Sequence, residues 1–342
     1  MTNISTTTSA RNRSVDTFRL LAALGVVVLH VEYPNVPSEI AIGLRLMSRW
    51  AIPFFFLISG YFLAANNTKS NRLNVQPVVE RLIWIFLVWA FVYAFVVIYQ
   101  HDLSTSIQRI VSPYFIYFGN FVHLWFLPSL IFGYLIIAFC YNFNLKGLLI
   151  VLSILAVITT LLSGSYAVID LGMPLDLAAA SVWLSIPFLY IGFLFYKKGH
   201  PAWWVSCLLI IFGAGLQVFE ARFLANKFGS SPYEHEFLLG TIPFGIGMAG
   251  LALSDLKFLK YSIFSNWGRD YSLGIYLIHP LIAILLSKFI SPFSPELLGN
   301  PIWQISAPLI IISISIMLLG LLRRYFPSGF NIIVGKQTKS NQ

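Results

Sequence analysis

The stretch Ser14-Val-Asp-Thr-Phe-Arg-Leu-Leu-Ala-Ala-Leu-Gly-Val-Val-Val-Leu-His30 decides the fold. It has the length and apolar content of a membrane helix, but Asp16, Arg19 and His30 interrupt it. The eleven-residue step from Arg19 to His30 is about three helical turns, so both side chains project from one side, about 16 Å apart along the axis. Ionisable side chains are costly in hydrocarbon, and we therefore expect this stripe to face protein or water.

Two interpretations of the stripe remain open at the level of sequence. Arg19 can snorkel to cytoplasmic headgroups while His30 stands at the outer interface, which would make both residues anchors. Alternatively, Arg19 holds an anion at the start of the helix, where Ser14 is expected to be the cap and where Asp16 or a phosphate supplies the negative charge. Three polar residues on one side favour the second interpretation.

The composition is that of a polytopic membrane protein. Of the 342 residues, 58% are hydrophobic and only 10% are charged, whereas about a quarter of a soluble protein is charged. The net charge of +9 therefore reflects membrane topology rather than nucleic-acid binding. No small-residue cleavage site follows the first apolar segment, so we expect that segment to be retained. Cys140 and Cys207 lie in apolar segments and indicate neither a disulfide nor a metal framework.

Ten apolar segments predict an all-α integral membrane domain with about ten transmembrane helices. They are expected at 16–33, 42–65, 79–99, 120–140, 145–163, 177–196, 202–220, 236–253, 270–290 and 302–322. Sixteen basic residues fall on the side of the N-terminus and six on the other, so both termini are expected in the cytoplasm. The predicted organisation is a cytoplasmic tail at 1–15, a ten-helix domain at 16–322, and a second cytoplasmic tail at 323–342 that is polar and loose.

One glycine motif points to a different function. Gly245-Ile-Gly-Met-Ala-Gly250 matches the dinucleotide-binding pattern, and Asp270 follows twenty residues later. The glycines lie inside a hydrophobic segment with no predicted strand before them, so close approach of membrane helices is the better interpretation.

Two further motifs lie toward the inner side of the membrane. The second segment ends with Pro53-Phe-Phe-Phe-Leu-Ile-Ser-Gly-Tyr-Phe62, in which Pro53 is expected to kink the helix. The small residues Ser59 and Gly60 leave space beside the helix, which serves either helix packing or the passage of a ligand. Arg81, at the start of the third segment, either anchors the helix or binds an anion.

Histidines occur near tryptophan and tyrosine in two other segments. His123-Leu-Trp-Phe-Leu-Pro128 stands at the outer end of the fourth segment, where Trp125 suits an aromatic belt and His123 is expected at a depth similar to that of His30. In the ninth segment Tyr276 and His279 share one helix face, and their expected role is structural hydrogen bonding between helices.

At these residues the chain resembles the membrane acyltransferase family 3. The resemblance rests on Asp16-Thr-Phe-Arg19 leading to His30, on Phe55–Gly60, on His123–Leu127 and on Leu273–Pro280, in this order over about 14–322. The chain looks most similar to stand-alone O-acetyltransferases, such as the one that modifies enterobacterial common antigen.

The resemblance implies transfer of an acyl group, usually acetyl, from cytoplasmic acyl-CoA to a hydroxyl of a cell-envelope carbohydrate. The location it implies is the bacterial inner membrane, with multiple passes. Many relatives with a fused extracytoplasmic domain carry two arginines three residues apart in the third helix. Here Arg81 has Val78 and Trp84 at those positions, so that paired donor contact is not carried over.

Ester formation from a thioester needs a base that works near neutral pH and a donor that stabilises the oxyanion. His30 is predicted to be the base because an unperturbed imidazole titrates near that range, and His123 is a candidate for the oxyanion donor. Arg19 is assigned to both catalysis and donor binding. Arg72, Arg81 and Ser59 complete the predicted donor site, since arginine suits the phosphates of CoA.

Acceptor binding is predicted on the outer side. Arg45 and Arg49 lie four residues apart and share a face, where they can bind a phosphate of a lipid-linked glycan or pair with Glu32 or Glu39. Glu32 and Trp125 are further acceptor-side candidates, and Asp16, Tyr276 and His279 are supporting residues.

The expected partners are membrane lipid, the carbohydrate acceptor and acetyl-CoA as a co-substrate. No bound cofactor, metal or nucleic acid is expected, and the oligomeric state is not predicted. A transporter or flippase for a lipid-linked glycan is the alternative function, with the polar stripe as its pathway. A membrane assembly subunit is a third.

Overall fold

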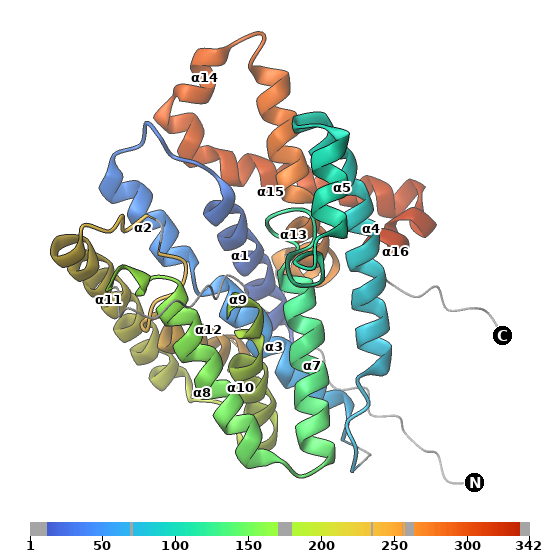
Figure 1. The fold of residues 1–342 in the computed structure, drawn as a ribbon, viewed down its shortest axis with the longest axis vertical. Helices are drawn as coiled ribbons and strands as arrows, with labels where there is room; N and C mark the ends of the chain where they lie inside the picture. The colour runs from blue at the N-terminus through green and yellow to red at the C-terminus, as the bar shows by residue number, and fades with distance from the viewer. Residues whose placement is uncertain are drawn as a thin grey trace.

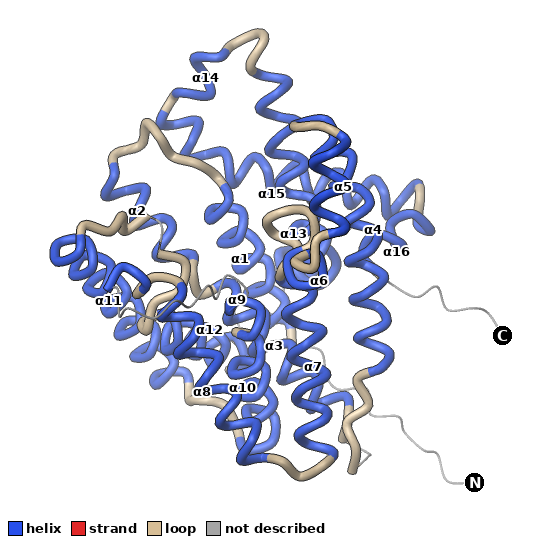
Figure 2. Tube along the Cα trace, in the orientation of Figure 1, coloured by secondary structure: helices blue, strands red, loops and turns tan. Residues whose placement is uncertain are grey.

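The computed structural model describes residues 12–68, 71–169, 180–233, 235–254, 256 and 263–335. Over these residues the chain is helical, with turns and loops between helices and no strand (Figure 2). This confirms the all-α class, which follows from a simple constraint. In hydrocarbon the backbone has no water to bond, so an isolated segment must satisfy its own polar groups as a helix.

Every predicted apolar segment coincides with a long helix or with two consecutive helices. The long helices are α1 (Arg13–His30), α2 (Ser38–Ser48), α3 (Ala51–Asn66), α4 (Gln76–Gln100), α7 (Phe126–Asn142), α8 (Lys146–Ser163), α10 (Ser185–Lys198), α11 (Trp203–Phe228), α12 (Thr241–Leu253), α13 (Ile263–Ile290) and α15 (Pro301–Tyr325). The short ones are α5 (Leu103–Val111), α6 (Phe115–Phe118), η1 (Ala167–Ile169), α9 (Ala180–Trp183), α14 (Pro295–Gly299) and α16 (Pro327–Val334).

Within the described residues, six helical stretches are long and apolar enough to cross a membrane. They are α2 and α3 taken together, α4, α8, α11, α13 and α15. The first helix, α1, is not among them because Arg13, Asp16 and Arg19 all fall within its 18 residues. The protein is therefore a multi-pass membrane protein by its helices, while a total of ten spans and cytoplasmic termini stay predictions.

Helix α1 lies in the interior of the bundle (Figure 1). It packs most extensively against α13 and also contacts α2, α3 and α15. The helices α3 and α10 pack closely because Gly60 and Gly192 lie in their contact. A Cβ atom at either glycine would overlap the backbone of the other helix, at Leu189 or at Leu57. Gly60 thus serves helix packing, one of the two roles that its sequence suggested.

The glycine motif in α12 also serves helix packing. A Cβ atom at Gly247 would come within 2.7 Å of the carbonyl oxygen of Ser206 in α11. The motif lies within a helix and no strand precedes it in the described part of the chain, so the structure favours close helix approach over dinucleotide binding.

The predicted kink in the second segment lies at the turn between α2 and α3. A proline lacks the N–H donor, and its ring clashes with the carbonyl four residues earlier, which here belongs to Arg49. The helix is interrupted at Arg49 and Trp50, four and three residues before Pro53.

Three local predictions differ from the structure. The cap of α1 is Asn12 rather than Ser14, because the Asn12 side chain accepts a hydrogen bond from the Val15 amide at 3.1 Å. The fourth predicted segment begins as turns, and α7 starts only at Phe126. Gly119, just before these turns, has a φ of +67°, a backbone conformation that interrupts the helix.

The third difference is in the C-terminal tail, where α16 packs against α4 and α15. Phe330 and Val334 are buried there, and the indole of Trp89 donates a hydrogen bond to the Ile333 carbonyl at 2.9 Å. A few apolar residues were enough to fold this segment, although they are too few to predict a membrane span. The N-terminal tail up to residue 11 and the C-terminal residues 336–342 lie outside the described residues.

Candidate active site

Three histidines from distant parts of the chain form one cluster. His30 ends α1, His123 lies in the turns before α7, and His279 is in α13. The ring centroids of His30 and His279 are 5.0 Å apart, and those of His123 and His279 are 5.6 Å apart. The histidines expected at a similar depth are thus brought together, with His279 between them.

The hydrogen bonds of the His30 and His279 rings determine which ring nitrogen can accept a proton. Nδ1 of His30 lies 2.9 Å from the Val26 carbonyl oxygen, and Nδ1 of His279 lies 2.8 Å from that of Tyr276. A carbonyl only accepts, so Nδ1 carries the proton in each ring, and Nε2 is left with a lone pair when the imidazole is neutral. His30 is exposed and His279 is buried. His30 Nε2 is therefore the accessible basic nitrogen of this pair.

His123 is held between α4 and α13. The hydroxyl of Tyr276 donates to the backbone carbonyl of His123. The ring of Tyr93 lies 4.7 Å from that of His123, and its hydroxyl donates to the Leu277 carbonyl at 2.8 Å. The tyrosine of the Tyr276–His279 pair thus makes a hydrogen bond between elements, whereas the histidine bonds only to its own helix.

Three buried ring nitrogens of the histidine cluster have no hydrogen-bond partner within the described chain. Both ring nitrogens of His123 and Nε2 of His279 are buried without a hydrogen bond. Unsatisfied buried polar atoms are costly, which is typical of a site that waits for a ligand or a proton. Among the described residues, no group of three or more His, Cys, Asp or Glu side chains is arranged to hold a metal ion.

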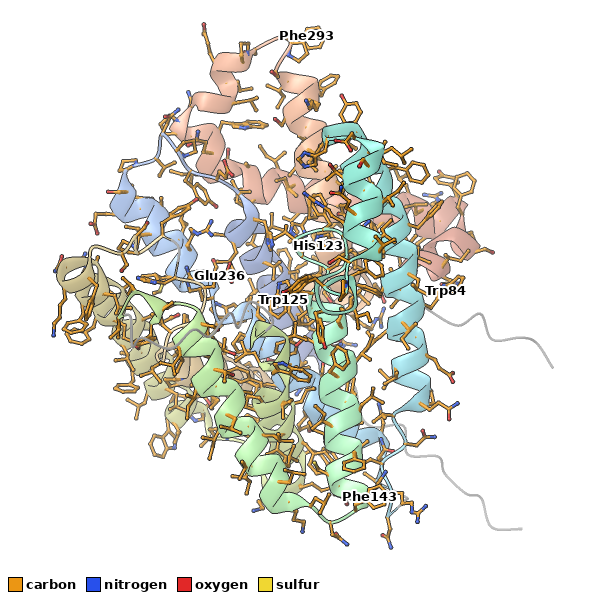
Figure 3. All side chains as sticks on the ribbon, viewed as in Figure 1. Trp84, His123, Trp125, Phe143, Glu236 and Phe293 are labelled. Atoms are coloured by element: carbon orange, nitrogen blue, oxygen red, sulfur yellow. The ribbon has the colours of Figure 1, made fainter. Side chains whose placement is uncertain are left out.

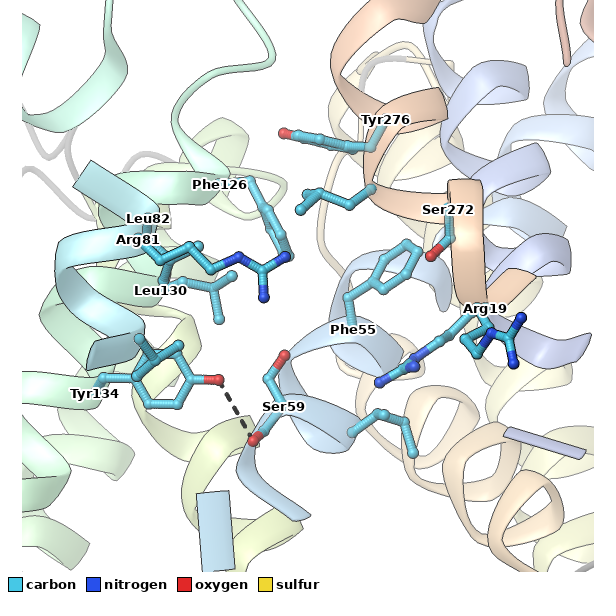
Figure 4. A pocket seen from close by; sticks show the side chains of 14 residues that line it. Arg19, Phe55, Ser59, Arg81, Leu82, Phe126, Leu130, Tyr134, Ser272 and Tyr276 are labelled. Atoms are coloured by element: carbon cyan, nitrogen blue, oxygen red, sulfur yellow. Dashed lines mark hydrogen bonds between the residues drawn. The ribbon is translucent and has the colours of Figure 1, made fainter. Parts of the chain in front are cut away.

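A cavity of about 360 Å³ lies beside this cluster. Its walls include the three arginines Arg19, Arg81 and Arg269, together with Ser59 and Tyr276. In Figure 4 the side chains of Arg19 and Arg81 come from opposite sides of the space, with Ser59 below and Tyr276 above. We call this the inner cavity. Tyr276 belongs to both the cavity wall and the histidine cluster, so the two sites adjoin.

Each arginine of the inner cavity is held by a protein partner. Arg19 pairs with Asp16 at 3.2 Å, and its guanidinium lies 4.9 Å from the ring centre of Phe62. Arg81 donates to the Val334 carbonyl of α16 at 3.0 Å. A guanidinium has five N–H groups, so these contacts leave donors for a ligand.

The third arginine was not assigned a role from the sequence. Arg269 makes two hydrogen bonds to the carboxylate of Asp270, at 2.8 and 2.9 Å, and Asp270 also pairs with Arg323 at 2.6 Å. The charge of Arg269 next to an apolar segment was the sequence feature that could have identified it. Arg72, which the sequence analysis placed with the donor site, is exposed in the loop before α4 and does not line the cavity.

A second cavity, of about 160 Å³, is lined by Arg49, Trp125 and Glu236, with Leu29 and Ser163 among the other lining residues. We call it the outer cavity. Figure 3 shows Trp125 and Glu236 in the same region as His123. Glu236 was assigned no role from the sequence.

The other acceptor-side candidates lie elsewhere. The guanidinium of Arg45 stacks on the ring of Tyr233 at 4.1 Å, and Glu32 is exposed outside the cavity lining. The expected pairing of Arg45 or Arg49 with Glu39 is wrong, because Glu39 pairs with Arg222 at 2.9 Å. Neighbours in a loop sequence proved to be a poor guide to partners that come from another helix.

The two cavities are lined by neighbouring residues of the same elements, which we call the partition. On α3, Ile52 lines the outer cavity and Phe55 the inner one, and the consecutive residues Trp125 and Phe126 divide in the same way. Leu29 of the outer cavity directly precedes His30. Each cavity thus has one lining residue next to the cluster, Tyr276 in the inner cavity and Leu29 in the outer one, while His30, His123 and His279 line neither.

The fold and the site define a multi-pass membrane protein with a histidine cluster close to two cavities that contain charged side chains. The family described as an acyltransferase domain matches residues 12–322, and the chain belongs to that family.

Two curated relatives are amino-acid racemases by name. An amino-acid racemase of Enterococcus faecalis is 24% identical over 322 residues, which cover 84% of this chain and 44% of that protein. A serine/alanine racemase of Enterococcus gallinarum is 29% identical over 140 residues, covering 37% of this chain and 19% of the relative. The chain spans less than half the length of these relatives. No solved structure matches the chain.

Proposed function

We propose that this protein is an O-acyltransferase that moves an acyl group, most simply acetyl, from cytoplasmic acyl-CoA to a hydroxyl of a cell-envelope carbohydrate. The observation that carries the proposal is the arginine-lined inner cavity that ends at Tyr276, beside the histidine cluster. Membership of the acyltransferase family supports the type of reaction. The donor, the acceptor and the base are argued from the chemistry of the site.

The inner cavity suits an acyl-CoA donor. Arg19, Arg81 and Arg269 offer charge-assisted hydrogen bonds to phosphates, and the phenylalanines Phe55 and Phe126 offer apolar walls to a flexible arm. The rise of an α-helix places Arg19 and His30 about 16 Å apart along the axis, a distance that a long donor arm can cover.

The histidine cluster suits the transfer step. Nε2 of His30 takes the proton of the acceptor hydroxyl while that oxygen forms a bond to the acyl carbon. His123, in the tautomer that presents an N–H group, stabilises the tetrahedral oxyanion. The intermediate collapses with cleavage of the carbon–sulfur bond, and the thiolate takes the proton from His30 and leaves as CoA. His30 thus acts as base and then as acid.

The orientation completes the proposal. The donor enters from the cytoplasm, the side where both termini are expected, and the acceptor approaches from the opposite side of the bacterial inner membrane. The racemase activity is named for the relatives and does not carry over to this chain. The matched region is less than half of those proteins, and the family that matches 12–322 is one of acyltransferases.

The test is transfer of labelled acetyl from acetyl-CoA to envelope glycan in membranes that contain the protein. Wild type should label the glycan and His30→Ala should not. The matched control is His200→Ala, because His200 is exposed in the loop after α10 and is remote from the site in sequence. Mass spectrometry of envelope glycans with and without the gene should show the acyl group only with it. Movement of glycan without label would instead indicate a transporter.

A further inference from the structure

Arg49 is buried without enough partners. Its side chain is only 4% exposed, yet the hydrogen bond it makes in the described structure is a long one, 3.4 Å, from a terminal nitrogen to the Tyr233 carbonyl. Its Nε is buried without any partner there. A buried guanidinium with unsatisfied N–H groups is costly unless a ligand completes it. Because Arg49 lines the outer cavity, that ligand would bind in the cavity.

A carboxylate lines the same cavity but does not neutralise this arginine. Glu236 is exposed toward the cavity, and no ion pair joins it to Arg49 in the described part of the chain. Arg45 and Glu236 are the charged groups that act on Arg49 from nearby. A donor and an acceptor that share one cavity without pairing call for a ligand that both accepts and donates hydrogen bonds.

The other lining residues narrow the class of ligand. The Ser163 hydroxyl donates its hydrogen to the Thr159 carbonyl at 2.7 Å, so it offers only its oxygen to a ligand. Trp125 contributes a broad, amphipathic indole to the wall. Hydroxyl groups on a ring with apolar C–H faces match this lining. A phosphate accepts but does not donate, and it would meet the negative charge of Glu236.

The outer cavity is also next to the proposed base. Leu29 lines it and His30 follows directly. Arg45 and Glu236 are again the charged groups that act on His30 from nearby. A hydroxyl of a ring bound between Arg49 and Glu236 would therefore lie near the end of α1 that carries His30.

We propose that the outer cavity is the acceptor subsite and that it binds one neutral sugar ring, whose hydroxyls are shared between Arg49 and Glu236. The subsite rests on the proposed function, since it supplies the hydroxyl that is acylated. Its volume, less than half that of the inner cavity, fits a single ring. Recognition is through hydroxyls and not through a lipid phosphate.

The experiment measures labelled acetyl transfer in membranes, with the apparent KM determined separately for endogenous envelope glycan and for acetyl-CoA. Glu236→Gln and Arg49→Lys should each raise the glycan KM about ten-fold or more, as expected for a lost charge-assisted hydrogen bond. The acetyl-CoA KM should stay unchanged, which also shows that the variants fold. The matched controls are Glu39→Gln and Arg222→Lys, because that pair is exposed and makes its contact away from the cavity.

Whether Glu236→Gln raises or lowers the glycan KM distinguishes a sugar ligand from a phosphate ligand. A phosphate ligand would bind more tightly without the carboxylate, so a lowered glycan KM would overturn the sugar assignment. Competition provides a second measurement. Free glucose, galactose, mannose or N-acetylglucosamine at tens of millimolar should compete with glycan and not with acetyl-CoA. Inorganic phosphate and L-serine should not compete.

Failure of the proposed function and failure of the sugar subsite give different results. If wild type transfers no label, the proposed function is overturned. If wild type transfers label while both variants keep the wild-type glycan KM, or if L-serine competes and no monosaccharide does, only the sugar subsite is overturned.

Discussion

The inner and outer cavities differ in how their arginines are held. In the inner cavity Arg19, Arg81 and Arg269 each have a partner within the protein, namely Asp16, the Val334 carbonyl and Asp270. In the outer cavity Arg49 is buried with one long hydrogen bond in the described structure, and Glu236 remains unpaired with it. Under the proposed function, the difference fits preorganised charge for a multiply anionic donor on one side and an unfinished hydrogen-bond set for a neutral acceptor on the other.

The largest expected effect is that of losing His30, the proposed base. His30→Ala, and equally His30→Gln, should lower the rate of acyl transfer by about a hundred-fold to ten-thousand-fold, the usual contribution of a general base. The measurement is label transfer at saturating donor and glycan, with protein level in the membrane as control. Near-normal transfer by either variant would remove His30 from the mechanism.

The next effect should be confined to the inner cavity. Arg19→Ala and Arg81→Ala should each raise the apparent KM for acetyl-CoA by about 10- to 100-fold, because a charge-assisted phosphate contact contributes about 1.5–3 kcal/mol. Arg19→Lys keeps the charge without the bidentate geometry and should rescue only in part. The control is Arg72→Ala, which should have little effect because Arg72 lies outside the cavity lining. Equal effects on the glycan KM would contradict the separation of the two sites.

The contact between α3 and α10 offers a stability test. Gly60→Val should destabilise the protein by about 1–3 kcal/mol, because the added side chain would meet the backbone of Leu189. The midpoint of thermal unfolding in detergent measures this. Gly215→Val is the matched control, since a Cβ atom at Gly215 meets nothing within 4 Å. Similar midpoints for the two variants would show that α3 and α10 do not depend on their close approach.

The smallest effect should come from the C-terminal helix. A chain that ends at Phe326 lacks α16 and therefore the carbonyls that hold Arg81 and Trp89. Losing one hydrogen bond of about 1 kcal/mol should raise the acetyl-CoA KM about five-fold, with the glycan KM unchanged. Trp89→Phe keeps α16 and removes one of its hydrogen bonds, so its effect should be smaller still. A shortened chain with unaltered donor KM would assign α16 to stability alone.

Sequence was informative where the signal is local. Hydropathy located the helices because a membrane helix must be apolar over its own length, and the cost of burying charge singled out Arg19 and His30. Arg81 was found as a charge at the start of an apolar segment, and Ser59 as part of a pair of small residues. The structure places both in the lining of the inner cavity.

Contacts between distant helices could not be read from one sequence. Nothing local places His279 between His30 and His123, or tells that Tyr93 faces His123 rather than lipid. For Arg49 the sequence left open a glycan phosphate or a loop glutamate as partner, whereas the carboxylate that shares its cavity comes from residue 236. Such partners depend on how helices pack, which propensity and hydropathy do not encode.

The partition built from Ile52 and Phe55 on α3, and from Trp125 and Phe126 at the start of α7, has a consequence for energy supply. Activated thioesters are made inside the cell, and the periplasm or cell exterior has no such store. Under the proposed function, this arrangement lets the acyl group alone change compartments while the nucleotide carrier stays behind. In the proposed reaction the cell thus uses the energy of cytoplasmic thioesters to modify carbohydrates on its exterior. The nucleotide carrier stays in the cytoplasm.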